Sequence, residues 1–78
     1  MIEFTAKEFW EKYGADGIKA SEEDVTITVT KGSEYRTYLM HGPKSGSIIV
    51  KGSGDGNACR YGSGKGNAWR YGPGKGDA

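Results

Sequence analysis

Cysteine, histidine and proline are scarce in this 78-residue sequence, which holds one Cys, one His and two Pro. A single Cys59 excludes an internal disulfide, and Trp69 takes the equivalent position ten residues later, so nothing there requires a thiol. No apolar run approaches the roughly 20 residues that span a membrane. Residues 1–13 lack the basic start and apolar core of a signal peptide, so a cytoplasmic location is expected.

The parts of a catalytic or cofactor site are missing as well. His41 and Cys59 are too isolated for a metal site or a nucleophile–base pair, and His41 is expected in an exposed turn. A Walker loop needs Ser or Thr after Gly-Lys, but Gly64-Lys65 and Gly74-Lys75 are each followed by glycine. A Rossmann loop needs a βαβ unit, which this length does not hold. A shared calcium ladder is excluded because the slot of Asp55 becomes lysine in both later copies. We therefore expect no enzyme, no metal and no cofactor.

Charge and size also limit the classes of partner. The net charge is +1, which gives no strong field toward nucleic acid or membrane. The first 51 residues carry a net charge of −1 and the last 27 carry +2. A chain of this length makes one small domain, residues 1–78, with little core. We expect a helix and hairpin core over 1–51 and glycine-rich repeats over 52–78.

Helix signals are confined to the N-terminal region. Thr5 and Glu8 form a T-x-x-E capping box, and Phe4 with Phe9 forms a hydrophobic staple around it. Gly14 can end the helix in a left-handed conformation. These signals predict a short helix over residues 6–13, with its aromatic stripe in the core.

Three strands are predicted next. Residues 25–30 alternate apolar residues with threonine, which is typical of a half-buried strand. Turns at 31–34 and 42–46 separate it from strands at 35–40 and 47–50. Short turns favour a hairpin, so we predict an α+β fold in which the helix packs on a small antiparallel sheet.

A ten-residue repeat follows and overlaps these strands. Gly-Ser or Gly-Pro recurs at 32, 42, 52, 62 and 72. From Gly52 onward every even position is Gly, Ala or Arg, including all nine glycines of the segment. A period of two indicates extended chain with one nearly bare face. The sheet is therefore predicted to continue as a glycine-rich decapeptide β-repeat, either an antiparallel meander or a narrow solenoid with ten residues per coil. A flexible linker is the third arrangement.

The repeats also supply the candidate partner-binding residues, which combine cations with aromatic rings: Arg60, Tyr61, Lys65, Trp69, Arg70 and Tyr71. Such residues stack on unpaired bases and follow phosphates in single-strand binders. They can instead contact a partner protein, or pack on one another and on bare glycine backbone. The bare face could also pair between chains and give a homo-oligomer or self-assembling module.

Three segments together resemble a known group of proteins. The opening T-A-K-E-F-W-E-K-Y-G, then D-V-T-I-T-V, then G-x-G-x-G-N/D-A-x-R copies are similar to small uncharacterised proteins of tailed bacteriophages and prophages. The resemblance carries no active site. It implies a small non-enzymatic accessory protein in the host cytoplasm that binds and modulates a host protein, including a defence system. A single-stranded nucleic-acid binder and a structural β-repeat remain the alternatives.

Overall fold

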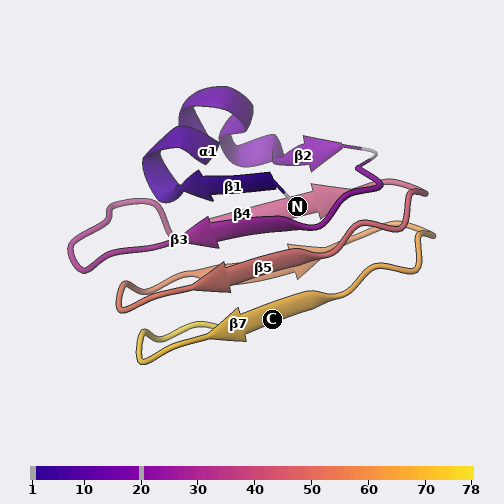
Figure 1. Cartoon of the computed structure of the whole chain (residues 1–78). Coiled ribbons are helices and arrows are strands. Elements are labelled where there is room, and N and C mark those ends of the chain that lie inside the picture. Colours follow the sequence, from indigo (N-terminus) through magenta and orange to yellow (C-terminus); the bar gives the residue numbers. More distant parts are fainter. Residues whose placement is uncertain (1, 20) are drawn as a thin grey trace.

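The fold is a short stack of parallel β-coils closed at one end by a helix (Figure 1). The computed structural model describes residues 2–19 and 21–78. Its elements, in chain order, are β1 (Ile2–Thr5), α1 (Ala6–Tyr13), the 3-10 turn η1 (Gly14–Asp16), β2 (Ile18–Lys19), β3 (Val25–Thr28), β4 (Thr37–His41), β5 (Ile48–Lys51), β6 (Asn57–Arg60) and β7 (Ala68–Tyr71).

Helix α1 spans the predicted residues and begins with the predicted capping box. The Thr5 hydroxyl accepts from the Glu8 backbone N–H at 3.2 Å, and the Glu8 carboxylate accepts from the Thr5 N–H at 2.9 Å. Phe9 is fully buried and meets Phe4 edge-on at 5.8 Å. The Trp10 indole N–H donates to the Thr37 carbonyl oxygen at 3.0 Å, which ties the helix to β4.

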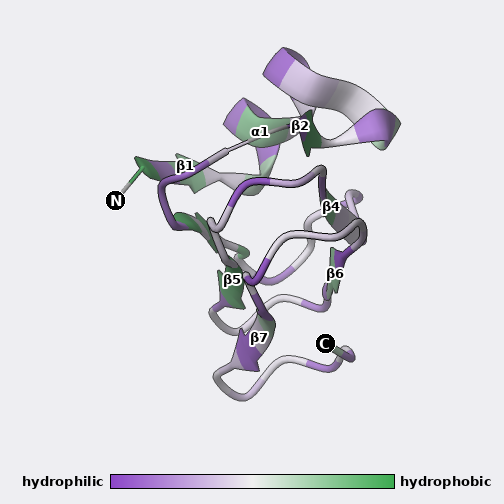
Figure 2. Ribbon diagram, turned by 90° about the vertical axis from the view of Figure 1, so that its right-hand side faces the viewer, coloured by the Kyte–Doolittle hydropathy of each residue, from purple (hydrophilic) through white to green (hydrophobic). Residues whose placement is uncertain are grey.

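Every strand pairing is parallel, so the predicted antiparallel sheet is wrong. One sheet has the order β1-β3-β5-β7 and the other β2-β4-β6. Figure 2 shows them end-on as two facing columns, with the chain crossing from one to the other after each strand. β3 and β4 were expected to form a hairpin, yet they lie in different sheets. The alternation of apolar residues is the same in parallel and antiparallel strands, so it could not reveal this.

One coil contains two decapeptides rather than one. Ile48 pairs with Ala68 and Tyr38 with Ala58, both at a spacing of twenty residues. Each ten-residue copy supplies one strand and one turn, and the next copy supplies the strand of the opposite sheet. The repeat is therefore neither a meander nor a ten-residue coil.

Backbone contact between stacked turns explains the glycines. A Cβ at Gly66 would lie closer than 3.0 Å to the carbonyl oxygen of Gly46, and one at Gly76 equally close to that of Gly56. A Cβ at Gly62 would likewise collide with the backbone of Gly42. The φ of Gly62, +105°, is in addition a conformation that favours glycine. In the turns, the bare positions predicted from the sequence are thus those at which one coil lies directly on the next, whereas in the strands the same even positions face inward.

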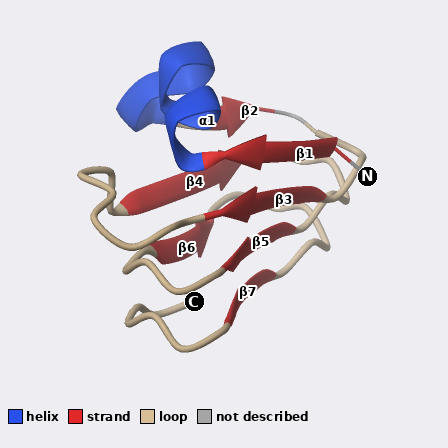
Figure 3. Cartoon of the chain, turned by 60° about the vertical axis from the view of Figure 1, so that its left-hand side comes forward, coloured by secondary structure: helices blue, strands red, loops and turns tan. Residues whose placement is uncertain are grey.

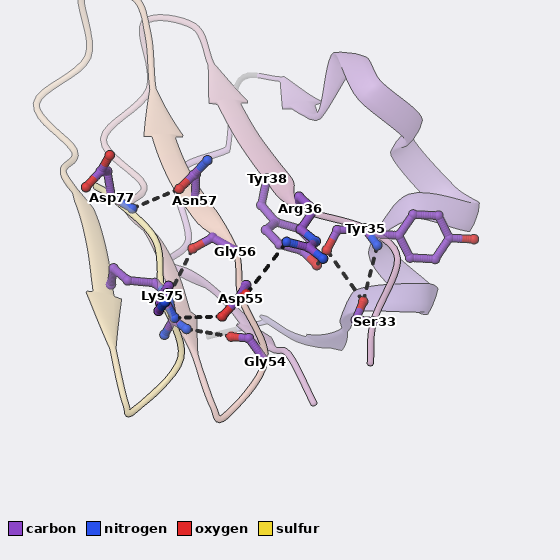
Figure 4. Close-up of polar contacts among 11 residues, drawn as sticks. Ser33, Tyr35, Arg36, Tyr38, Gly54, Asp55, Gly56, Asn57, Lys75 and Asp77 are labelled. Carbon is purple, nitrogen blue, oxygen red and sulfur yellow. Dashed lines mark hydrogen bonds and ion pairs between the residues drawn. The ribbon is translucent and has the colours of Figure 1, made fainter. Parts of the chain in front are cut away.

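Polar side chains hold the coils in register at the turns. The Asp55 carboxylate accepts from the Lys75 backbone N–H at 2.9 Å, and the Asn57 side-chain oxygen accepts from the Asp77 N–H at 2.8 Å (Figure 4). The Ser47 hydroxyl likewise accepts from the Asn67 backbone N–H at 3.0 Å. Each bond joins residues twenty apart, so outward-facing Ser, Asp and Asn satisfy backbone N–H groups of the following coil.

The core narrows from the helix toward the C-terminal coil. Near α1 it holds the large side chains of Phe9, Ile27, Tyr38 and Met40, all fully buried. Along one inward ladder the residues change from Ile48 to Ala68 between successive coils. The helix end therefore contains most of the buried apolar area, which is the main stabilising term for so small a domain.

We expect Gly66→Ala to destabilise the fold by about 3 kcal/mol, because its methyl group would force apart the coils that contain Gly46 and Gly66. Gly32→Ala is the control. A Cβ there meets nothing within 4 Å, so only the positive φ of +85° is penalised, at about 1 kcal/mol. Urea unfolding followed by circular dichroism measures both variants. Equal losses would contradict backbone contact as the reason for Gly66.

A second prediction concerns Tyr38, whose hydroxyl donates to the Tyr35 carbonyl oxygen at 2.7 Å. Burial raises the pKa of this hydroxyl, so the unfolded chain loses the proton at a lower pH than the folded chain. Its contribution to stability is complete below the ordinary value of about 10 and falls as pH rises beyond it. Tyr38→Phe should flatten the fall in unfolding free energy above about pH 10. The same fall in Tyr38→Phe as in the wild type would contradict this assignment.

Candidate partner-binding site

The structure separates the six candidate residues into three groups. Trp69 and Tyr71 project from the outer face of β7, in the four-stranded sheet. Tyr61 directly follows β6, in the three-stranded sheet, and Lys65 lies in the turn between β6 and β7. Arg60 and Arg70 point inward. No single flat surface therefore contains all six.

Trp69 and Tyr71 form the largest exposed aromatic feature. Their rings lie 6.3 Å apart between centroids and are within 12° of parallel, and the residues are 44% and 54% exposed. They are adjacent because side chains two apart on a strand share a face. On the neighbouring strand, Trp69 pairs with Ile49 and Tyr71 with Lys51. We call these four residues the aromatic face.

A second ring pair lies on the opposite sheet. Tyr61 stacks on His41, with ring centroids 5.5 Å apart and planes 26° from parallel. Sequence reasoning treated His41 as an isolated turn residue and missed this pair. The spacing of twenty between His41 and Tyr61 was the available signal, because it equals the length of one coil.

Both arginines bind the carbonyl oxygens of the turns beneath them. Arg70 replaces the inward-facing Val50 of the previous coil. Its guanidinium donates to Gly56 at 2.9 Å and to Gly54 at 2.7 Å, and reaches further carbonyl oxygens. The Arg60 guanidinium likewise donates to the carbonyl oxygens of Gly42, Lys44 and Gly46 in the turn of the previous coil. The five-donor fork of arginine suits this task, since turn carbonyls have few backbone donors in reach.

Two lysines lie on the aromatic face or in the turn that precedes β7. Lys51 belongs to the face itself, and Lys65 lies in the turn before β7. Two ion pairs occur among residues 2–19 and 21–78, Arg36 with Asp55 at 3.6 Å and Lys44 with Glu22 at 3.3 Å. Lys51 and Lys65 take part in neither. They are left to attract negative groups on a molecule that contacts the aromatic face.

Hollows in the surface are open and shallow. One of about 470 Å³ is lined by residues of β6, of the turn after it and of the start of β7, with Ala78 at its rim. Another of about 410 Å³ lies between α1 and the turn after β3. Within the described part of the chain, no group of three or more His, Cys, Asp or Glu residues is arranged to hold a metal ion.

Comparison with protein-family models, with curated proteins and with solved structures finds no match for this chain. None of the helices formed by residues 2–19 and 21–78 has the length and apolar character needed to cross a membrane. The class that the structure itself defines is a small two-sheeted parallel β-solenoid with a helical cap.

Arg70→Lys tests the internal role of the arginine. A lysine has the same charge but cannot span several carbonyl oxygens, so we expect a loss of about 2 kcal/mol in unfolding free energy. Lys51→Met changes a charge on the same sheet without touching these bonds and should stay within about 0.5 kcal/mol of the wild type. Urea unfolding provides the measurement. An unchanged stability for Arg70→Lys would contradict the carbonyl network.

Proposed function

We propose that this chain is a small non-enzymatic binding protein of the phage accessory kind, which uses its aromatic face to contact and modulate a host protein. The observation that carries the proposal is the pair of parallel, exposed rings of Trp69 and Tyr71 on a paired strand. Tryptophan and tyrosine are over-represented among the residues that contribute most to binding energy.

The fold lowers the entropic cost of using these rings. β7 is paired along its length with β5, and Arg70, between the two aromatic residues, is bonded to the turn beneath. Side chains on an ordered strand lose less conformational freedom on binding than side chains on a loop. A free tail could present the same residues, but at a higher cost.

The charges indicate the chemistry of the partner surface. Lys51 adjoins Tyr71, and Lys65 lies in the turn before β7. A protein surface with an apolar pocket and acidic residues at its rim would satisfy both the rings and the lysines. The two arginines add little to this attraction, because their donors already serve carbonyl oxygens.

Single-stranded nucleic acid is the second candidate, because the same parallel rings and neighbouring lysines could stack on bases and follow phosphates. It requires more cationic contacts than the face offers once the arginines are turned inward. Its signature is a steep loss of affinity with salt, which a contact dominated by aromatic burial lacks.

Affinity capture from a bacterial host lysate, followed by titration with the purified captured protein, tests the proposal. We expect Trp69→Ser/Tyr71→Ser to weaken binding at least about thirtyfold, the effect of losing a major binding residue. Tyr61→Ser is the matched control, since Tyr61 is as exposed as Tyr71 but lies on the other sheet. It should bind like the wild type.

Two results would contradict this function. If the double variant captures the same proteins with the same affinity as the wild type, the aromatic face does not bind them. If the captured material is nuclease-sensitive and binding falls steeply between 50 and 500 mM salt, the second candidate replaces the first.

A further inference from the structure

The two ends of the coil stack differ in how their strand edges are covered. At one end, α1 packs against β1 (Figure 3). The Trp10 indole N–H also donates to the Thr37 carbonyl oxygen of β4. At the other end, β7 has β5 on one side, and no strand of the described residues lies on the other. An uncovered edge presents unpaired backbone donors and acceptors to another strand.

The pairing of β7 with β5 shows which backbone groups are uncovered. The Ile48 N–H donates to the Asn67 carbonyl oxygen at 2.9 Å, so the backbone of residue 67 faces β5. Alternate residues of a strand direct their N–H and C=O groups to opposite sides, so Trp69 and Tyr71 also face β5. The N–H and C=O groups of Ala68 and Arg70 therefore point away from the sheet.

One antiparallel register satisfies all of these groups in a second copy of the chain. Ala68 must lie opposite Arg70 of the other copy, and the reverse, so that four N–H···O=C bonds form. Trp69 then lies opposite its own copy on the two-fold axis. This pair is of the non-hydrogen-bonded kind, in which side chains come closest, and aromatic pairs there stabilise a sheet.

We propose that this chain forms a two-fold symmetric dimer in which β7 pairs antiparallel with β7 of a second copy, with Trp69 at the axis. The edge fits itself, so no other surface is needed. Because α1 occupies the far end of each stack, the interface cannot continue head to tail, and association stops at two copies. The dimer goes beyond the proposed host interaction and does not depend on it.

In this dimer the four-stranded sheets join into one of eight strands. The outer faces remain free, and the rings of Tyr71, Trp69 and their copies form a continuous strip across the axis. A partner surface could therefore contact twice as many rings as one chain presents.

Analytical ultracentrifugation of the wild-type chain is the first test and requires no variant. We expect a monomer–dimer equilibrium without larger species between 10 µM and 1 mM. A monomer at 1 mM would overturn the proposal. Continued growth to larger assemblies would overturn the closed interface.

Cysteine cross-linking tests the register. In a Cys59→Ala background, Trp69→Cys places two thiols across the axis with Cα atoms about 4.5 Å apart, within the range that a disulfide spans. Tyr71→Cys is the matched control, because four residues of offset separate its two copies by about 13 Å. With diamide as oxidant, Trp69→Cys should form linked dimers at least tenfold faster. Equal rates would overturn the register.

Discussion

Close contact between the backbones of successive turns is the constraint on which the rest of the structure depends. Parallel coils can stack only if their corners lie as near to one another as their strands do, and a side chain at Gly66 or Gly76 would prevent this. The contact fixes the direction of every strand, because each coil must follow the path of the one before it. It also determines that two decapeptides make one coil, which in turn decides which residues share a face.

The glycines let the turns stack closely, and the arginines hold the stacked turns by hydrogen bonds. Arg60 and Arg70 supply donors from inside the coil to carbonyl oxygens of the glycine-rich turns. They replace apolar residues in the inward ladder just where the core becomes narrow, since Arg60 pairs with Met40 and Arg70 with Val50. The end near α1 is thus held by buried apolar side chains and the far end by hydrogen bonds to backbone.

Local signals in the sequence were accurate and long-range ones were not. The capping box located α1 at residues 6–13, and alternation located β3 and β5 to within two residues. Neither the capping box nor the alternation depends on the direction of the neighbouring strand. The predicted hairpin and antiparallel sheet were therefore wrong. For the candidate site, the even positions of Arg60 and Arg70, shared with glycine and alanine, already placed them on the bare face. The twenty-residue period was needed to separate Tyr61 from Trp69 and Tyr71.

The two-decapeptide coil has a consequence for how such a sequence can change in length. Gain or loss of twenty residues adds or removes a whole coil and returns every later strand to its own sheet. Gain or loss of ten residues exchanges the sheets for everything that follows. An insertion of one decapeptide between β6 and β7 would transfer Trp69 and Tyr71 to the side of the molecule that carries His41. A change by an odd number of decapeptides therefore moves the aromatic face to the other sheet, whereas a change by an even number leaves it in place.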